Sequence, residues 1–386
     1  MNNADQAASQ FEQIFSRRPS VVSNAGGRVN IIGEHTDYHE GFVFPAAIGL
    51  RTWATAAGRE DGIIRIRSAN ENDEVSDTVA GLSPPEKVDW RAYTLGPIWA
   101  LREAGHRIPG ADILVNGDVP FGGGLSSSAS VEVAMIGALA ALAEVELEGQ
   151  EVARIARMAE NIYCHVPCGI MDQTASACGR TGQALLLDCR SLEIQYAPLR
   201  AEWAIVVADS CVKHSVGGGE YARRQKQCST GLAKIKAKYP GVRAARDVSV
   251  DMLEEVKGSL DNLEYRRLRH AVTENARCLS ARDAMLAGDD SKMGALLYAS
   301  HESLARDYEV SCDELDTLVG IAHACPGIIG ARLTGAGFGG NTVNLVHAAK
   351  AAGFCEMLQE GYLTKTGKTT ITRIVSAAGG LEVIRV

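Results

Sequence analysis

The stretch VPFGGGLSSSAS at residues 119–130 combines the residue types that bind phosphate groups. Its three glycines (122–124) lack a Cβ atom, so the backbone can adopt positive φ angles and approach a ligand closely. The alanine-rich run that follows predicts a helix, and the free N–H groups and dipole at a helix start favour an anion. The three serines (126–128) add hydroxyls for phosphate oxygens or Mg²⁺. The stretch therefore predicts a phosphate site without the lysine of a P-loop, and an ordinary helix cap is the alternative.

A second polar cluster lies in GRVNIIGEHTDYHEG, residues 27–41. A strand-like run separates Arg28 from a short loop that presents Glu34, His35 and Asp37 together. Because each carboxylate can accept hydrogen bonds from two hydroxyls, this group suits a ligand that carries many hydroxyls. The alternatives are an ordinary charged loop or a metal site, although the spacing of the histidine and carboxylates matches no zinc pattern.

Two further segments carry residues typical of a ligand site, and each has an ordinary alternative. In CGIMDQTASACG, residues 168–179, Asp172 begins a helix-like stretch, where it can cap the helix or act as a base toward a hydroxyl. In RLTGAGFGGNTVNLV, residues 332–346, four glycines separate two strand-like runs. This second glycine loop is either a hairpin turn or a backbone that passes close to a ligand.

Strand-like and helix-like segments alternate along the chain, which indicates an α/β or α+β protein. The predicted strands cover residues 29–32, 52–57, 63–67, 113–115, 184–188, 204–208, 331–334, 342–346 and 370–375. The predicted helices cover residues 125–144, 151–164, 219–238, 261–287, 291–306, 312–324 and 348–363. The helix-rich block between residues 219 and 324 predicts a second domain that begins near residue 190.

The composition restricts the class of protein. The chain has 386 residues, 46% hydrophobic and 22% charged, with a formal net charge of −8, which argues against a binder of nucleic acid or anionic membranes. The basic runs RRQKQ (223–227) and RRLR (266–269) are interpreted as solvated helix faces. The longest stretch without Asp, Glu, Lys or Arg, residues 333–349, has 17 residues, against the ~20 that a membrane-spanning helix needs. Ten cysteines without a C-x-x-C pair and a start without signal-peptide features predict reduced thiols in the cytoplasm.

One P-loop-like match, GYLTKTGKT at residues 361–369, is interpreted as a helix end and turn. Five residues separate Gly361 from Gly367, where the motif requires four. The segment also follows a predicted helix, whereas a P-loop follows a strand and opens a helix.

Taken together, these segments resemble those of galactokinases, within the GHMP kinases (galactokinase, homoserine, mevalonate and phosphomevalonate kinases). GRVNIIGEHTDY is similar to the signature that sets galactokinases apart in that family, VPFGGGLSSSAS to its ATP phosphate loop, and LTGAGFGG to its C-terminal glycine motif. CGIMDQ, LLLDCRSLE, GGGEYARRQKQC and DYEVSCDELD also match galactokinase segments. The resemblance runs from about residue 20 to about residue 375.

The resemblance implies an α+β, two-lobed GHMP-kinase fold. Its N-terminal lobe (1–189) would be ribosomal-protein-S5-domain-2-like and carry the galactose signature and the phosphate loop. Its C-terminal lobe (190–386) would be ferredoxin-like with extra helices and carry the C-terminal glycine motif. The implied activity is that of an ATP-dependent sugar 1-kinase, which transfers the γ-phosphoryl group of MgATP to the anomeric hydroxyl of α-D-galactose.

The resemblance also implies a role for individual residues. Asp172 is the implied catalytic aspartate, either as the acceptor of the hydroxyl's proton or only as an orienting group, and Arg28 stabilises charge beside it. The implied sugar-binding residues are Glu34, His35, Asp37, Gly169 and Tyr221. The implied ATP-binding residues are Gly122, Gly123, Gly124, Leu125, Ser126, Ser127, Ser128 and, near the adenine, Trp90. The implied Mg²⁺ ligands are Ser128 and Glu160, and the ion with the helix start would replace the missing lysine.

Several positions depart from the family's usual residues, and they bear on the sugar rather than on the chemistry. His39 and His165 are expected at the edge of the sugar pocket; the other departures are Gly26, Gly49, Ala336 and Asn341. The alternatives are a kinase for N-acetylgalactosamine, arabinose or a galacturonate, and a non-catalytic sensor of galactose and ATP, against which the intact serine loop argues. The expected partners are galactose and ATP, with no nucleic acid and no membrane, for a monomer.

Overall fold

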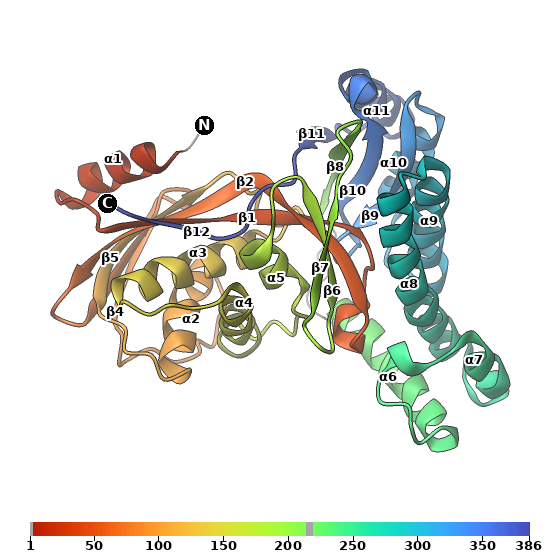
Figure 1. Cartoon of the computed structure of the whole chain (residues 1–386), viewed down its shortest axis with the longest axis horizontal. Helices are drawn as coiled ribbons and strands as arrows, with labels where there is room; N and C mark the ends of the chain where they lie inside the picture. The colour runs from red at the N-terminus through yellow and green to blue at the C-terminus, as the bar shows by residue number, and fades with distance from the viewer. Residues whose placement is uncertain (1–2, 214–218) are drawn as a thin grey trace.

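The computed structural model describes residues 3–213 and 219–386, which form two β-sheets with helices packed on them (Figure 1). The larger sheet has eight strands and the smaller sheet has four. The two sheets lie toward opposite ends of the long axis of the molecule, so the two-lobed α+β architecture is confirmed.

The larger sheet is built mainly from the first half of the chain, in the order β12-β1-β2-β5-β3-β4, with β6 and β7 added beside β2. Alternation along its strands divides two apolar clusters between its faces: Ala56 and Ile113 pack against α2, α3 and α4, while Ala57 and Leu114 pack against α1. The strands are β1 (Val21–Ile32), β2 (Phe42–Arg59), β3 (Ile63–Ser68), β4 (Asp73–Thr78), β5 (Gly110–Gly117), β6 (Gln183–Asp188), β7 (Ile194–Pro198) and β12 (Glu382–Arg385). The helices are α1 (Ala4–Phe15), α2 (Trp90–Glu103), α3 (Ser127–Leu142), α4 (Gly149–Met158) and α5 (Met171–Cys178).

The smaller sheet is antiparallel, in the order β11-β8-β10-β9. Val206 and Ala208 face α10 and α11, whereas Ile205 and Val207 face a core that also contains residues of α8, α9, β1 and β2. The strands are β8 (Trp203–Lys213), β9 (Ile328–Thr334), β10 (Gly339–His347) and β11 (Ile371–Val375). The helices are α6 (Gly219–Lys238), α7 (Val250–Val256), α8 (Asn262–Ala287), α9 (Asp290–Ser303), α10 (Asp313–Ala324) and α11 (Ala351–Thr366). One continuous apolar core therefore joins the two lobes.

Every predicted strand and helix corresponds to an element of the structure, but the prediction missed several others. Helix α2 contains Gly96 and Pro97, both unfavourable inside a helix, and burial against Tyr163 and Ala159 outweighs this preference. The predicted helix over 151–164 is confirmed, although its second part is a π-helical turn (Ala159–Tyr163) that continues α4. The other missed elements are α1, α7, β4, β7 and β12.

Two details concern the end of the chain. The strand predicted at 370–375 is confirmed as β11, but it is not the last strand, because the four-residue β12 follows a Gly-Gly pair and joins β1. The interpretation of residues 361–369 as a helix end and turn is confirmed: α11 ends at Thr366, and Gly367, with φ of 71°, caps it.

The interpretation of the basic runs as solvated helix faces is wrong for their central residues. Arg224 is buried and donates to the backbone carbonyls of Tyr308 and Glu309. Arg267 is 1% exposed and bonds to the Asp307 carbonyl and the Glu309 carboxylate. These arginines hold the turn that follows α9 rather than facing water.

The division into lobes at residue 189 stays a prediction. Strand β7 and strand β12 both follow that position in the chain, yet both belong to the larger sheet. Among the described residues, no helix is long and apolar enough to cross a membrane.

Candidate active site

The glycine- and serine-rich loop joins β5 to α3, and its geometry is that of a backbone turned toward a ligand. Gly122 and Gly124 both have φ of 69°, a conformation that residues with a Cβ rarely adopt. Ser126 also has a positive φ of 57°, and α3 begins at Ser127, two residues later than predicted. The Ser126 hydroxyl does not cap the helix, because it donates to Asp172 Oδ2 at 2.5 Å.

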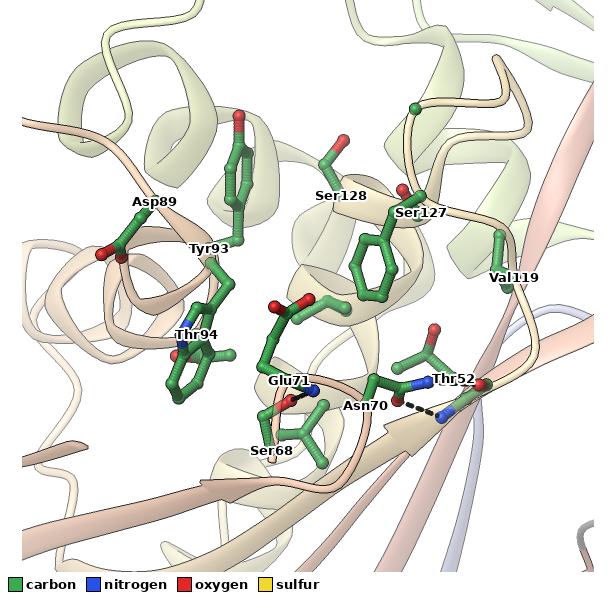
Figure 2. A pocket seen from close by; sticks show the side chains of 16 residues that line it. Thr52, Ser68, Asn70, Glu71, Asp89, Tyr93, Thr94, Val119, Ser127 and Ser128 are labelled. Atoms are coloured by element: carbon green, nitrogen blue, oxygen red, sulfur yellow. Dashed lines mark hydrogen bonds between the residues drawn. The ribbon is translucent and has the colours of Figure 1, made fainter. Parts of the chain in front are cut away.

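Two cavities flank this loop, and Gly122, Ser127 and Ser128 line both of them. The first, which we call the aromatic cavity, has a volume of about 560 Å³ (Figure 2). Its other lining residues are Thr52, Ser68, Asn70, Glu71, Asp89, Trp90, Tyr93, Thr94, Val115, Gly117, Val119, Phe121 and Val131. The second, which we call the polar cavity, has a volume of about 360 Å³. Its other lining residues are Arg28, Glu34, His35, Asp37, Gly124, Ser126, Val166, Pro167, Cys168, Gly169, Met171, Asp172, Tyr221, Gly335 and Ala336.

Asp172 and Arg28 form a two-pronged ion pair in the wall of the polar cavity. Arg28 Nε lies 2.8 Å from Asp172 Oδ1, and Arg28 Nη2 lies 2.8 Å from Asp172 Oδ2. The third guanidinium nitrogen, Nη1, donates to the Gly124 carbonyl at 2.6 Å, so the arginine joins the aspartate to the glycine loop. Asp172 is therefore not a helix cap: its carboxylate accepts from Arg28 and Ser126, and α5 has no side-chain cap.

The predicted sugar-binding residues converge on the polar cavity from distant parts of the chain. Glu34, His35 and Asp37 follow β1, Gly169 precedes α5, and Tyr221 lies in the first turn of α6. A Cβ on Gly169 would lie 1.6 Å from Asp37 Oδ2, so only glycine leaves room for this carboxylate. The fit explains why the CGIMDQ and GEHTDY segments both belong to the site. Residues 217–218 of the GGGEYARRQKQC segment lie outside the described residues.

A chain of hydrogen bonds fixes His35. Its Nδ1 lies 2.7 Å from the Tyr38 hydroxyl, which lies 2.9 Å from the Tyr308 hydroxyl. Burial and the nearby His270 lower the pKa of His35 to about 3, so the ring is neutral at physiological pH. His35 thus lines the cavity as a neutral hydrogen-bonding group.

Two carboxyl groups near Asp172 have raised pKa values. Burial, followed by the charges of Asp172 and Glu34, raises the pKa of Asp37 to about 7. Burial and the charge of Asp172 also raise the pKa of Glu160 to about 7, although the nearby Ser128 hydroxyl and Cys168 thiol oppose this. The site therefore concentrates acidic groups that a cation or hydroxyl groups would stabilise in the charged form.

Ser128 and Glu160 fit a magnesium ion in their chemistry. Both offer oxygen atoms, which Mg²⁺ prefers, and the Ser128 hydroxyl lies near enough to Glu160 to lower the pKa of that carboxyl. Ser128 also faces both cavities, where it can reach a nucleotide phosphate. Within residues 3–213 and 219–386, no group of three His, Cys, Asp or Glu side chains is arranged to hold a metal. Two protein ligands plus phosphate oxygens are what a nucleotide-bound Mg²⁺ needs.

Not every residue assigned by resemblance reaches a cavity. Leu125 is 1% exposed and packs in the core between the lobes, so only its backbone is left for a ligand, and Gly123 lines neither cavity. His39 packs behind Tyr38, and His165 lies within 3.2 Å of the Pro85 carbonyl, so neither expected edge residue lines the polar cavity. Trp90 does line the aromatic cavity.

The other departures from the family pattern lie near the lobe junction or in the sheet. A Cβ on Gly123 would lie 3.5 Å from the Asn341 amide nitrogen, so Asn341 touches the glycine loop, while Ala336 lines the polar cavity. Gly26 lies where a Cβ would be 2.6 Å from the Ile48 carbonyl, and Gly49 is exposed.

Sequence reasoning missed residues in both cavities. Tyr93 lies on α2, which was not predicted, and the turn with Ser68 and Asn70 is shaped by bonds to Glu71 N and Gly117 N (Figure 2). Arg332 and Thr334 on β9 contact Glu34, which lines the polar cavity. The available signal for Arg332 was a charged residue inside an apolar strand-like run, which calls for a buried partner.

Comparison with known proteins places this geometry in a family. The model of the GHMP kinases N terminal domain matches residues 92–180, and that of the GHMP kinases C terminal matches residues 281–362. The galactokinase galactose-binding signature matches residues 9–58. The mevalonate kinase of Methanococcus jannaschii shares the fold, with a TM-score of 0.64 at 19% identity, over 93% of this chain and 98% of that one. The two-lobed fold and the loop between two cavities thus define a GHMP kinase.

Closer relatives narrow the class. The galactokinase of Roseiflexus sp. (strain RS-1) is 41% identical over 372 residues, which cover 96% of this chain and 95% of the relative. The crystal structure of Lactococcus lactis galactokinase complexed with galactose superposes with a TM-score of 0.92 at 32% identity, over 97% of this chain and 98% of that one. The chain belongs to the galactokinase family.

Proposed function

We propose that this protein is a galactokinase, which transfers the γ-phosphoryl group of ATP to the anomeric C1 hydroxyl of α-D-galactose and releases galactose 1-phosphate and ADP. The observation that carries the proposal is the Asp172–Arg28 pair, bonded to the glycine loop at the junction of the two cavities. In this assignment the polar cavity binds the sugar and the aromatic cavity binds the nucleotide.

The chemistry follows from the groups that surround the polar cavity. Glu34 and Asp37 accept hydrogen bonds from ring hydroxyls, so a sugar that lacks or inverts one leaves a carboxylate unpaired. Asp172 orients the anomeric hydroxyl and accepts its proton as the new bond to phosphorus forms. Arg28, held by Asp172 and Gly124, stabilises negative charge on the attacking oxygen and on the transferring phosphoryl group.

Ser128 and Glu160 are the proposed residues for Mg²⁺, which when bound neutralises part of the charge on the nucleotide phosphates. The first backbone N–H groups of α3 and the open glycine turn add donors for the same phosphates. This arrangement supplies the positive potential that a P-loop obtains from a lysine. Trp90 and Tyr93 give the aromatic cavity flat surfaces suited to a nucleotide base.

The same proposal extends to the state and place of the protein. We expect the protein to act as a monomer, with both cavities lined by residues of the same chain. All ten cysteines are free thiols, which suits the reducing conditions of the cytoplasm.

A sugar panel tests the function. Purified protein with MgATP should release ADP with galactose at least about a hundredfold faster than with glucose, because the inverted C4 hydroxyl of glucose leaves a pocket group unpaired. N-acetylgalactosamine, arabinose and galacturonate complete the panel. No sugar-dependent release of ADP would contradict the kinase activity, whereas a faster reaction with another sugar of the panel would replace galactose as the substrate.

A further inference from the structure

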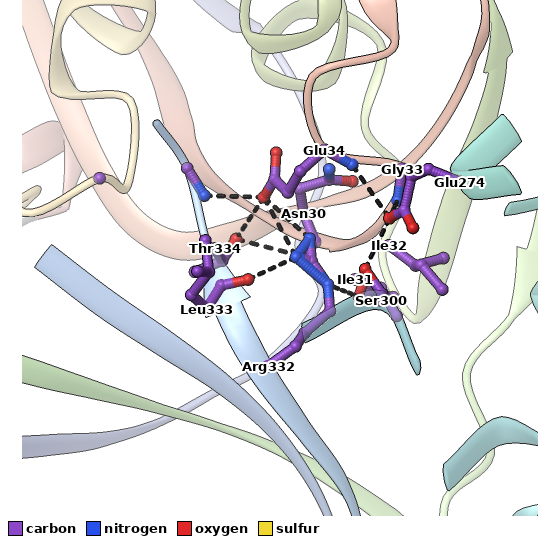
Figure 3. A network of polar contacts seen from close by, with 12 residues as sticks. Asn30, Ile31, Ile32, Gly33, Glu34, Glu274, Ser300, Arg332, Leu333 and Thr334 are labelled. Carbon is purple, nitrogen blue, oxygen red and sulfur yellow. Dashed lines mark hydrogen bonds and ion pairs between the residues drawn. The ribbon is translucent and has the colours of Figure 1, made fainter. Parts of the chain in front are cut away.

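The carboxylate of Glu34 is held by β9, a strand about 300 residues later in the chain (Figure 3). Arg332 Nη2 lies 2.9 Å from Glu34 Oε1, and the Thr334 hydroxyl donates to the same oxygen at 3.0 Å. The backbone N–H of Gly335 donates to it at 2.7 Å. All of these contacts converge on Oε1, so within the part of the chain that the structure describes Oε2 is left for a ligand in the polar cavity.

Arg332 is fully buried, and its position follows from its other contacts. Its guanidinium donates to the backbone carbonyls of Ile31, at 3.0 Å, and of Leu333. Because an isolated buried charge is strongly unfavourable, the arginine fixes the place of its carboxylate partner as much as the carboxylate fixes the arginine. Glu34 is itself only 2% exposed, so it has little room to rotate.

The backbone of the same residue is fixed from α8 and α9. Glu274 Oε1 accepts from the N–H of Gly33 at 3.0 Å and of Glu34 at 3.4 Å, and Ser300 donates to it at 2.6 Å (Figure 3). His270 Nε2 lies 3.1 Å from the Glu34 carbonyl. Both the main chain and the side chain of Glu34 are therefore held by the C-terminal lobe.

We infer that Arg332 and Thr334 are positioning residues that set the sugar selectivity of the site. The inference rests on the proposed role of Glu34 in binding a sugar hydroxyl. A carboxylate that can rotate follows a hydroxyl to a new position, whereas a fixed carboxylate leaves an epimer unpaired. The contacts of β9 and Gly335 with Oε1 thus hold the Glu34 carboxylate in one orientation, in which it discriminates between hydroxyl configurations.

Thr334 gives the cleanest test, because valine replaces it without a change of shape. Thr334→Val should raise the KM for galactose about tenfold, the effect of losing one hydrogen bond to a charged group, and should lower the preference for galactose over glucose. The KM for ATP should stay within about twofold, since no residue of β9 lines the aromatic cavity. Thr334→Ser, which keeps the hydroxyl, should restore most of the affinity for galactose.

Thr342→Val is the matched control for general damage to the fold. Thr342 lies on the neighbouring strand β10, is equally buried, and its hydroxyl accepts from Asn344 instead of contacting Glu34. Thr342→Val should lower the midpoint of thermal unfolding about as much as Thr334→Val does. It should leave the KM for galactose unchanged. If Thr334→Val also leaves this KM and the sugar preference unchanged, the inference is overturned.

Two more variants separate this inference from the proposed function. Glu34→Gln should raise the KM for galactose at least as much as Thr334→Val, and an unchanged KM would refute the sugar-binding role of Glu34 itself. Arg332→Lys keeps the charge but loses the planar fork, and should weaken galactose binding with little change in the KM for ATP. If Glu34→Gln weakens galactose binding while the Arg332 and Thr334 variants do not, only the positioning role is refuted.

Discussion

The aromatic cavity and the polar cavity share the serine loop but differ in the parts of the chain that build them. Residues 52–131 supply the whole lining of the aromatic cavity, whereas the polar cavity draws on segments from residue 28 to residue 336. The first is walled by aromatic rings and short polar side chains, and the second by charged groups held in hydrogen-bond networks. In the assignment that we propose, nucleotide binding is therefore a local property of one lobe, while recognition of the sugar depends on both lobes.

The largest effect is expected where the polar cavity meets the loop. Asp172→Ala should lower kcat by about 10²–10⁴-fold, the usual contribution of a positioned acid–base group, while the KM for ATP changes little. Sugar-dependent release of ADP under saturating substrates measures it. Asp172→Asn is the companion variant, since it keeps an orienting group but cannot take up a proton. Near-normal turnover of Asp172→Ala would remove the aspartate from the reacting centre.

A smaller effect, on the binding of ATP instead of on turnover, is expected in the aromatic cavity. Trp90→Ala should raise the KM for ATP about tenfold, as expected for the loss of one aromatic ring stacked on a base. The KM for galactose should stay within about twofold, because Trp90 lines the aromatic cavity and does not line the polar cavity. Trp90→Phe keeps an aromatic face, so its KM for ATP should lie between that of the natural protein and that of Trp90→Ala. Equal changes in both KM values would show that the cavities are not independent.

The smallest effect is on the pH dependence of stability. It comes from the acidic groups that lie close together around the polar cavity. The pKa of Asp37 is raised from 3.8 to about 7 in the ligand-free protein, so the folded state holds its proton more tightly than the unfolded chain. The stability that this proton contributes is complete below pH 3.8 and is lost as the pH rises through about 7. Asp37→Asn should therefore gain stability relative to the natural protein between pH 4 and pH 7.

Chemical denaturation of both proteins across this range measures the Asp37 effect. The unfolding free energy of Asp37→Asn minus that of the natural protein should rise with pH. A difference that stays constant between pH 4 and pH 7 would contradict the raised pKa of Asp37.

The same contrast explains which parts of the site could be predicted from the sequence. Glu34, Asp37 and the serines lie in short runs of unusual composition, so their residue types alone indicated a polyol and a phosphate. Tyr93 could not be found because its helix contains Gly96 and Pro97, whose preferences argue against a helix. Thr334 lies in the LTGAGFGG motif, but its contact with Glu34 could not be predicted, because that residue is 300 positions away.

The fold was predictable to a similar extent, for a similar reason. Strands and helices with strong apolar periodicity were found, whereas β12, a four-residue strand whose side chains are exposed, has no such pattern. RRQKQ and RRLR were interpreted as solvated helix faces from their charge, but Arg224 and Arg267 lie in the interior because they donate to backbone carbonyls of the turn after α9.

The distance in sequence between Glu34 and β9 has a consequence for the synthesis of the protein. At about 5–20 residues per second, roughly 15–60 s pass between translation of Glu34 and of Arg332. All residues of the aromatic cavity have been made by residue 131, well before the contacts on Glu34 can exist. A growing chain thus contains every lining residue of the aromatic cavity early, whereas the contacts that we propose to set sugar selectivity can form only after β9 has been made.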